Sequence, residues 1–111
     1  MEEFQHKQLA GGSWQKVPFF EQMANIGSEV ERAIGWREKG NLEYSQAACD
    51  RVLELLDLTI DDAKNQRRLR ELLRLREVLA DYFYSSNFFS SSDVLWEKYF
   101  FPFSWAARAE Y

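Results

Sequence analysis

The sequence predicts an all-α fold: an antiparallel up-and-down four-helix bundle, with the last helix kinked or split at Pro102. Apolar residues recur at intervals of three and four along most of the chain, which is typical of amphipathic helices. The connections between the first three predicted helices are short and favour antiparallel neighbours. A length of 111 residues fits one domain. We therefore expect a flexible tail over residues 1–15 and a single helical-bundle domain over residues 16–111.

The first predicted helix begins near Phe19 and ends near Lys39. Gly40 follows at the position where a helix commonly ends in a left-handed residue. Gly27 lies near the apolar side of this helix, and the close approach of a neighbouring helix would explain a glycine there. The residues of that apolar side are Phe19, Met23, Ile26, Val30, Ala33 and Ile34.

The second predicted helix begins after Asn41, a residue that is favoured as an N-cap. It ends at Thr59, which also opens the third helix with the capping-box pattern Thr59-Ile60-Asp61-Asp62. Its apolar face contains Leu42, Cys49, Val52, Leu53 and Leu56. An acidic stripe lies on another face and contains Glu43, Asp50, Glu54 and Asp57.

The third predicted helix ends around Tyr84, and a serine-rich loop follows it. Ser92 or Asp93 then caps the last segment, in which residues 94–107 are apolar almost all round. Such a helix must be buried on every side. The inward residues of the third helix are expected to be Leu69, Leu72, Leu73, Leu79, Ala80 and Phe83.

The aromatic C-terminal segment leaves more apolar surface than a four-helix monomer normally covers. A second copy of the chain would cover it in a homodimer, and a different protein could do the same. The alternative is burial within the chain, with help from Phe4 and Trp14 of the N-terminal tail. The segment favours a non-catalytic interaction module, with the interface candidates Trp96, Tyr99, Phe100, Phe103 and Trp105.

Arginines supply the candidate binding residues. Arg76 falls in the middle of the inward face of the third helix. A guanidinium there must meet an acid such as Glu29 or Glu38, a ligand, water at a helix end or cleft, or a subunit interface. A basic face for phosphate is formed by Arg67, Arg70 and Arg74. Acids are interleaved with these arginines, so a solvated face is the alternative. The net charge of -4 gives no overall attraction to nucleic acid.

The sequence contains no catalytic motif, and we expect neither an enzyme nor a cofactor. Cys49 is the only cysteine and His6 the only histidine, so the usual metal ligands are missing. Cys49 lies on an apolar helix face and is expected to be a core residue. No signal peptide and no membrane span is predicted, which suggests a cytoplasmic protein.

The stretch from Ala24 to Ile60 resembles the first helical hairpin of HEPN-type domains. An amphipathic helix, the turn Lys39-Gly40-Asn41 and the following helix to Leu56 carry the likeness. The resemblance implies a four-helix bundle and a dimer, and it suggests RNA or nucleotide binding through Arg76 or the arginine face. Ribonuclease members carry a histidine four to six residues after an arginine. Here no histidine follows Arg76, so no catalytic residue is implied.

Overall fold

The structure, a computed structural model, describes residues 12–109. Over this range it is all-α, with four helices in antiparallel contact and no strand, which confirms the predicted fold class. The α-helices are α1 (Phe19–Glu38), α2 (Leu42–Ile60), α3 (Leu69–Tyr84) and α4 (Asp93–Ala109). Two short 3-10 helices are η2 (Trp14–Lys16) and η3 (Ala63–Arg68).

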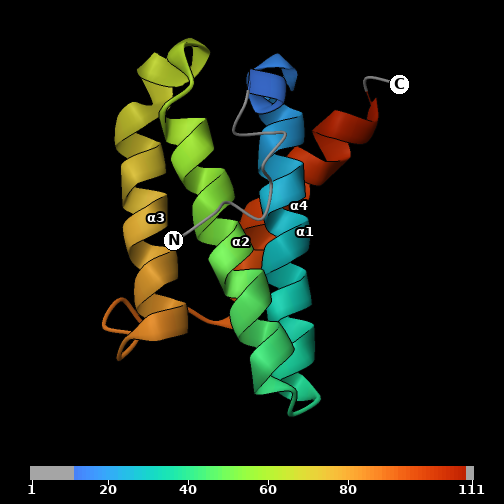
Figure 1. The fold of residues 1–111 in the computed structure, drawn as a ribbon, viewed down its shortest axis with the longest axis vertical. Coiled ribbons are helices and arrows are strands. Elements are labelled where there is room, and N and C mark those ends of the chain that lie inside the picture. Colours follow the sequence, from blue (N-terminus) through green and yellow to red (C-terminus); the bar gives the residue numbers. More distant parts are fainter. Residues whose placement is uncertain (1–11, 110–111) are drawn as a thin grey trace.

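The helices are not arranged as a symmetrical ring. Figure 1 shows α3, α2 and α1 side by side, with α4 crossing behind α1. The closest backbone packing joins α1 to α2 and α1 to α4, and α2 also packs against α3. Large side chains connect α4 with α3; for example, the rings of Trp96 and Tyr82 lie 6.2 Å apart. One side of α4 is therefore left without a neighbour among the helices of residues 12–109.

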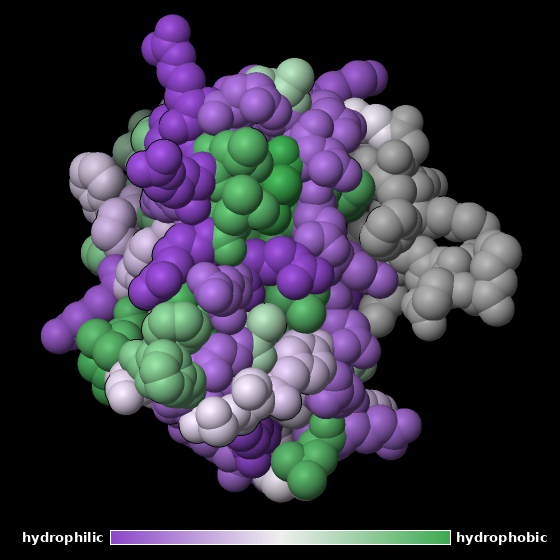
Figure 2. Space-filling model, turned by 90° about the vertical axis from the view of Figure 1, so that its left-hand side faces the viewer, coloured by the Kyte–Doolittle hydropathy of each residue, from purple (hydrophilic) through white to green (hydrophobic). Residues whose placement is uncertain are grey.

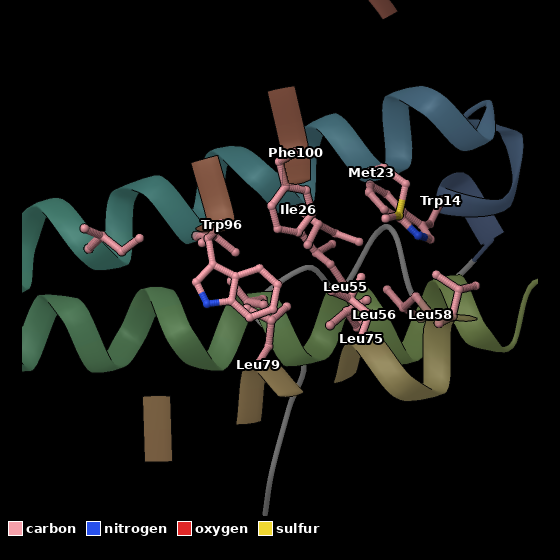
Figure 3. Packing of buried hydrophobic residues seen from close by; sticks show 14 residues of the cluster. Trp14, Met23, Ile26, Leu55, Leu56, Leu58, Leu75, Leu79, Trp96 and Phe100 are labelled. Carbon is pink, nitrogen blue, oxygen red and sulfur yellow. The ribbon is translucent and has the colours of Figure 1, made fainter. Parts of the chain in front are cut away.

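A single large core connects η2 with all four helices, as Figure 3 shows. Trp14 lies in this core with 2% of its surface exposed, so the predicted flexible tail does not extend to residue 14. The remaining tail residues up to position 11, including Phe4 and His6, lie outside the described residues. The labelled core residues besides Trp14 are Met23, Ile26, Leu55, Leu56, Leu58, Leu75, Leu79, Trp96 and Phe100.

The predicted helix ends are confirmed at three places. Gly40 has a φ of +80° and follows α1, and the N–H groups of Gly40 and Asn41 donate to the carbonyls of Arg37 and Trp36. This is the glycine-terminated pattern that satisfies the last carbonyl groups of a helix. The Asn41 side chain accepts a hydrogen bond of 3.0 Å from the N–H of Tyr44 and caps α2. Ser92 likewise accepts from the N–H of Leu95 and caps α4.

The predicted capping box at Thr59 is wrong. Helix α2 continues to Ile60, and Asp62 caps η3 by accepting a hydrogen bond from the N–H of Lys64. The hydroxyl of Thr59 is buried, where it donates to the carbonyl of Leu55 and accepts from the indole Nε1–H of Trp14 at 2.9 Å. Thr59 therefore anchors η2 instead of starting a helix.

The buried face of α3 differs from the predicted one. Leu73 is 50% exposed, whereas Leu75, which the prediction omitted, is buried. Because α3 begins only at Leu69 and packs mainly against α2, its buried strip is narrow and follows Leu72, Leu75 and Leu79. On α2, the predicted core residue Leu42 is also exposed, at the first position of the helix.

Candidate functional site

Helix α4 is the element with the strongest functional signal, because it is apolar on two opposite sides. It is one helix through Pro102, so the segment is not split. Trp96 and Phe100 point into the core between the other helices (Figure 3). Phe103 and Tyr99 are partly buried against the same core.

A very close contact seats α4 on α1. A Cβ added to Gly27 would lie 2.8 Å from the Cβ of Phe100, a distance that real side chains do not adopt. The predicted close approach at Gly27 is thus confirmed, and the neighbour is α4. Gly35, in contrast, has open space around the position of a Cβ.

Polar contacts hold the beginning of α4. Arg37 of α1 donates hydrogen bonds to the carboxylate of Asp93 at 2.6 Å and to the hydroxyl of Tyr82 at 3.1 Å. The Tyr82 hydroxyl also bonds to Asp93. The hydrogen bond to Tyr82 and the pair with Asp93 outweigh partial burial and raise the pKa of Arg37. An acid in the first turn also suits the positive end of the helix dipole. Helix α4 is thus docked at this end as well.

The outer face of α4 is the surface opposite its core contacts. Its apolar members are Val94, Leu95, Phe101, Pro102 and Trp105, all of which are exposed. At 3.6 residues per turn these positions fall within about a third of the helix circumference. Phe101 is 61% exposed and Trp105 is 63% exposed. The outer face is therefore an apolar strip along one side of the helix, with one exposed charged residue, Lys98, within it.

Elsewhere the exposed hydrophobic residues are more scattered. Figure 2 shows the side of the molecule that α3 occupies in Figure 1, and hydrophobic residues form separate patches there, divided by hydrophilic ones. Leu73 and Tyr84 are the exposed large hydrophobic residues of α3. Single exposed apolar residues are ordinary on protein surfaces, whereas contiguous strips mark interaction sites. The exposed aromatic and hydrophobic residues of α4 thus mark a possible interaction surface.

The structure separates the predicted interface candidates. Trp96 and Phe100 are core residues, so the alternative of burial within the chain holds for them. Tyr99 and Phe103 are partly buried, and only Trp105 lies on the outer face. Val94, Leu95 and Phe101 were missed as candidates. Helical spacing relative to Trp105 could have found two of them, because Val94, Phe101 and Trp105 share one side of a helix.

Arg76 does not lie in a buried pocket. Its side chain is 37% exposed and pairs with Asp57, with Nε and the nearer carboxylate oxygen 2.6 Å apart. The predicted partners Glu29 and Glu38 are wrong, because α3 packs beside α2 so that Asp57 of the acidic stripe meets Arg76, and Asp50 of the same stripe accepts a hydrogen bond from Tyr84. The hydrogen bond to Asp57 raises the pKa of Arg76 above its ordinary value. The interpretation of a structural ion pair therefore fits the observed geometry.

The predicted arginine face is exposed but partly engaged. Arg74 lies 3.8 Å from Glu77 and its guanidinium stacks 4.6 Å from the ring centre of Phe89. Arg67 lies on η3 and Arg70 on α3, both at the surface. The arginine face is thus a surface of mixed charge, on which Arg74 is held by Glu77 and Phe89.

A small apolar groove separates α3 from α4. Its volume is about 240 Å³, and it is lined by Glu71, Arg74, Leu75, Val78, Trp96 and Tyr99. The Tyr99 hydroxyl donates to Glu71 at 3.1 Å. Burial, together with this carboxylate, raises the pKa of Tyr99. The two charged lining residues are therefore both engaged, Glu71 by Tyr99 and Arg74 by Glu77.

Residues 12–109 hold no cluster of three or more histidine, cysteine, aspartate or glutamate side chains suited to a metal ion. In the same part of the chain, no helix combines the length and apolar character needed to cross a bilayer. Cys49 is buried beside Ala33 and Ala48, as predicted, and burial raises the pKa of its thiol to about 11.

No protein-family model, no curated protein and no solved structure matches this chain.

Proposed function

We propose that this protein is a non-catalytic helical interaction module that self-associates through the outer face of α4. One observation carries the proposal: Phe101 and Trp105 are more than half exposed on a helix whose opposite side is already packed in the core. Large aromatic side chains contribute the most to protein interfaces when they become buried. The outer face of α4 offers two of them on adjacent turns.

The core-facing side of α4, which carries Trp96 and Phe100, is fully packed against the rest of the chain. Gly27 admits Phe100 at the closest distance, and Arg37 holds Asp93 at the start of the helix. The exposure of the outer face therefore does not result from a loosely attached helix. A helix that is apolar on two sides needs a second packing partner. A second copy of the chain supplies an identical apolar surface, which two-fold symmetry allows to bury itself.

Size-exclusion chromatography with light scattering tests this proposal. We expect wild type to be a dimer that dissociates on dilution, and the double variant Phe101→Ala/Trp105→Ala to be a monomer with an unchanged circular dichroism spectrum. A matched control is Leu73→Ala/Phe88→Ala, which removes two exposed apolar side chains from α3 and the following loop. This control should remain a dimer. A folded wild-type monomer at the highest soluble concentration would contradict the proposal.

The alternative is an HEPN-like protein that binds RNA or nucleotides through Arg76 or the face formed by Arg67, Arg70 and Arg74. It is supported by the exposure of Arg67 and Arg70. It is disfavoured by the acids among these arginines and by the pairing of Arg76 with Asp57. Salt-dependent binding of short RNA that is lost in Arg70→Glu/Arg74→Glu would favour the alternative.

A further inference from the structure

Three charged side chains lie on or beside the outer face of α4. Glu97 and Arg108 lie on the same edge of the helix, because both line a cleft of about 330 Å³ between α4 and α1. Lys98 lies near the middle of the outer face, between Trp105 and Pro102 around the helix. None of the three charged residues forms an ion pair within residues 12–109.

Glu97 and Arg108 cannot pair with each other within one helix. They are separated by 11 positions, which at 1.5 Å per residue is about 16 Å along the axis. This edge of the outer face is therefore acidic toward the beginning of α4 and basic toward its end. This polarity distinguishes the two directions in which a second α4 could pack.

We propose that two copies of the chain pack their α4 helices antiparallel about a two-fold axis near Pro102, with Glu97 of each copy beside the partner's Arg108. This inference rests on the proposed self-association and adds its geometry. When a two-fold axis perpendicular to α4 relates two antiparallel copies, the edge with Glu97 and Arg108 lies on the same side of the interface in both copies. Residues of this edge therefore contact the same edge of the partner. The midpoint of positions 97 and 108 falls between Pro102 and Phe103, within the apolar strip and between Phe101 and Trp105.

The same register also places Lys98 and Phe101 opposite suitable groups of the partner. Lys98 comes level with the partner's Ala107, two positions from the partner's Trp105, which is within reach of its long side chain. A lysine over a tryptophan ring is a favourable cation–π contact. Phe101 comes level with the partner's Ser104, so it packs beside the partner's Trp105. The two exposed aromatic side chains on the outer face of each copy, Phe101 and Trp105, thus become buried against those of the partner.

A parallel arrangement is less favourable for all three charges. A two-fold axis along the helices would carry each edge to the opposite side, so Glu97 and Arg108 would lie beside apolar residues of the partner and stay unpaired. Lys98, near the middle of the outer face, would oppose the partner's Lys98, which is destabilising. The helix dipoles would also be aligned side by side, whereas antiparallel packing sets them in opposition. Charge complementarity thus selects the antiparallel direction.

Cross-linking of single cysteines determines the direction. In a Cys49→Ala background, Val94→Cys and Ala109→Cys are prepared separately and then mixed, with a short bis-maleimide as the linker. The antiparallel register places residue 94 close to the partner's Ala109, so we expect a cross-linked heterodimer only in the mixture. Efficient cross-linking of Val94→Cys with itself would overturn the inference in favour of a parallel dimer.

A charge swap provides a second, independent readout. We expect Glu97→Arg alone and Arg108→Glu alone to raise the dimer dissociation constant about tenfold, because each replaces two attractive pairs by two repulsive ones. The double variant Glu97→Arg/Arg108→Glu restores the pairs and should return to near the wild-type value. If wild type is a dimer but the double variant dissociates as readily as the single variants, the antiparallel geometry is contradicted and the proposed self-association still stands. A monomeric wild-type protein would contradict both the antiparallel geometry and the proposed self-association.

Discussion

Gly27 of α1 and Phe100 of α4 meet so closely that only a glycine fits at position 27. A Cβ at this position would approach the Cβ and ring atoms of Phe100 to within 2.8–3.0 Å. The Cβ of Phe100 cannot rotate away, because it is fixed to the backbone of α4. This contact therefore sets the distance between the two helices, and with it the position of the outer face of α4.

The substitution Gly27→Ala should lower the free energy of unfolding by about 1–3 kcal/mol, because the added methyl group forces α4 away from α1. Gly35→Ala is the matched control in the same helix. It meets open space and should raise stability by about 0.5–1 kcal/mol through better helix propensity. Urea denaturation monitored by circular dichroism measures both. Equal effects of the two substitutions would contradict the close contact.

Thr59→Val should destabilise the protein by about 1–3 kcal/mol at nearly constant side-chain volume, because it leaves the buried indole N–H of Trp14 without an acceptor. Thr59→Ser retains the hydroxyl and loses one methyl group, which should cost about 0.8 kcal/mol. Urea denaturation followed by tryptophan fluorescence compares the two variants. A valine variant as stable as wild type would show that this hydrogen bond contributes little.

Asp62 should make stability depend on acidic pH. Burial by itself would raise the pKa of Asp62, but hydrogen bonds from Lys64 and Gln22 outweigh it and lower the pKa below the ordinary value of 3.8. The folded state therefore binds the proton less tightly than the unfolded state. The resulting stabilisation is complete above the unfolded pKa and is lost as the pH falls through the folded pKa.

Asp62→Asn removes this contribution, so the stability difference between wild type and variant should shrink as the pH is lowered from 6 toward about 2. The exposed neighbour Asp61 provides the control, and Asp61→Asn should leave the pH profile near that of wild type. Urea midpoints measured across this pH range report the difference. A difference that stays constant with pH would argue against a lowered pKa at Asp62.

The thiol of Cys49 should resist modification in the folded protein. Its pKa of about 11 leaves almost no thiolate at pH 8, and its side chain is buried between α1 and α2. We expect Ellman's reagent to react with Cys49 only after denaturant is added. Immediate and complete reaction in native buffer would contradict this environment.

The ion pair between Arg76 and Asp57 should contribute little to stability. Both side chains are more than a third exposed, so solvent screens their attraction. A double-mutant cycle with Arg76→Ala and Asp57→Ala should give a coupling energy of about 0.2–1 kcal/mol that declines with added salt. A coupling well above that range, unaffected by salt, would indicate that the pair is shielded from solvent.

Local signals in the sequence were sufficient for much of the fold. Gly40, Asn41 and Ser92 terminate or cap helices through contacts that span only a few residues, so their roles follow from sequence position. Thr59 shows the limit of such signals. Its pattern with Asp62 is that of a capping box, but the indole of Trp14, 45 positions earlier, makes the hydroxyl a buried hydrogen-bond partner.

The sequence by itself determined the helical class, most helix ends, the close approach at Gly27 and an aromatic segment with more apolar surface than one side of a helix can bury. Only the tertiary structure decided that Trp96 is core while Phe101 is surface, and that Arg76 meets Asp57. Helical periodicity gives the relative directions of side chains around one axis. It does not specify which direction faces a neighbour, because that depends on where the other helices pack.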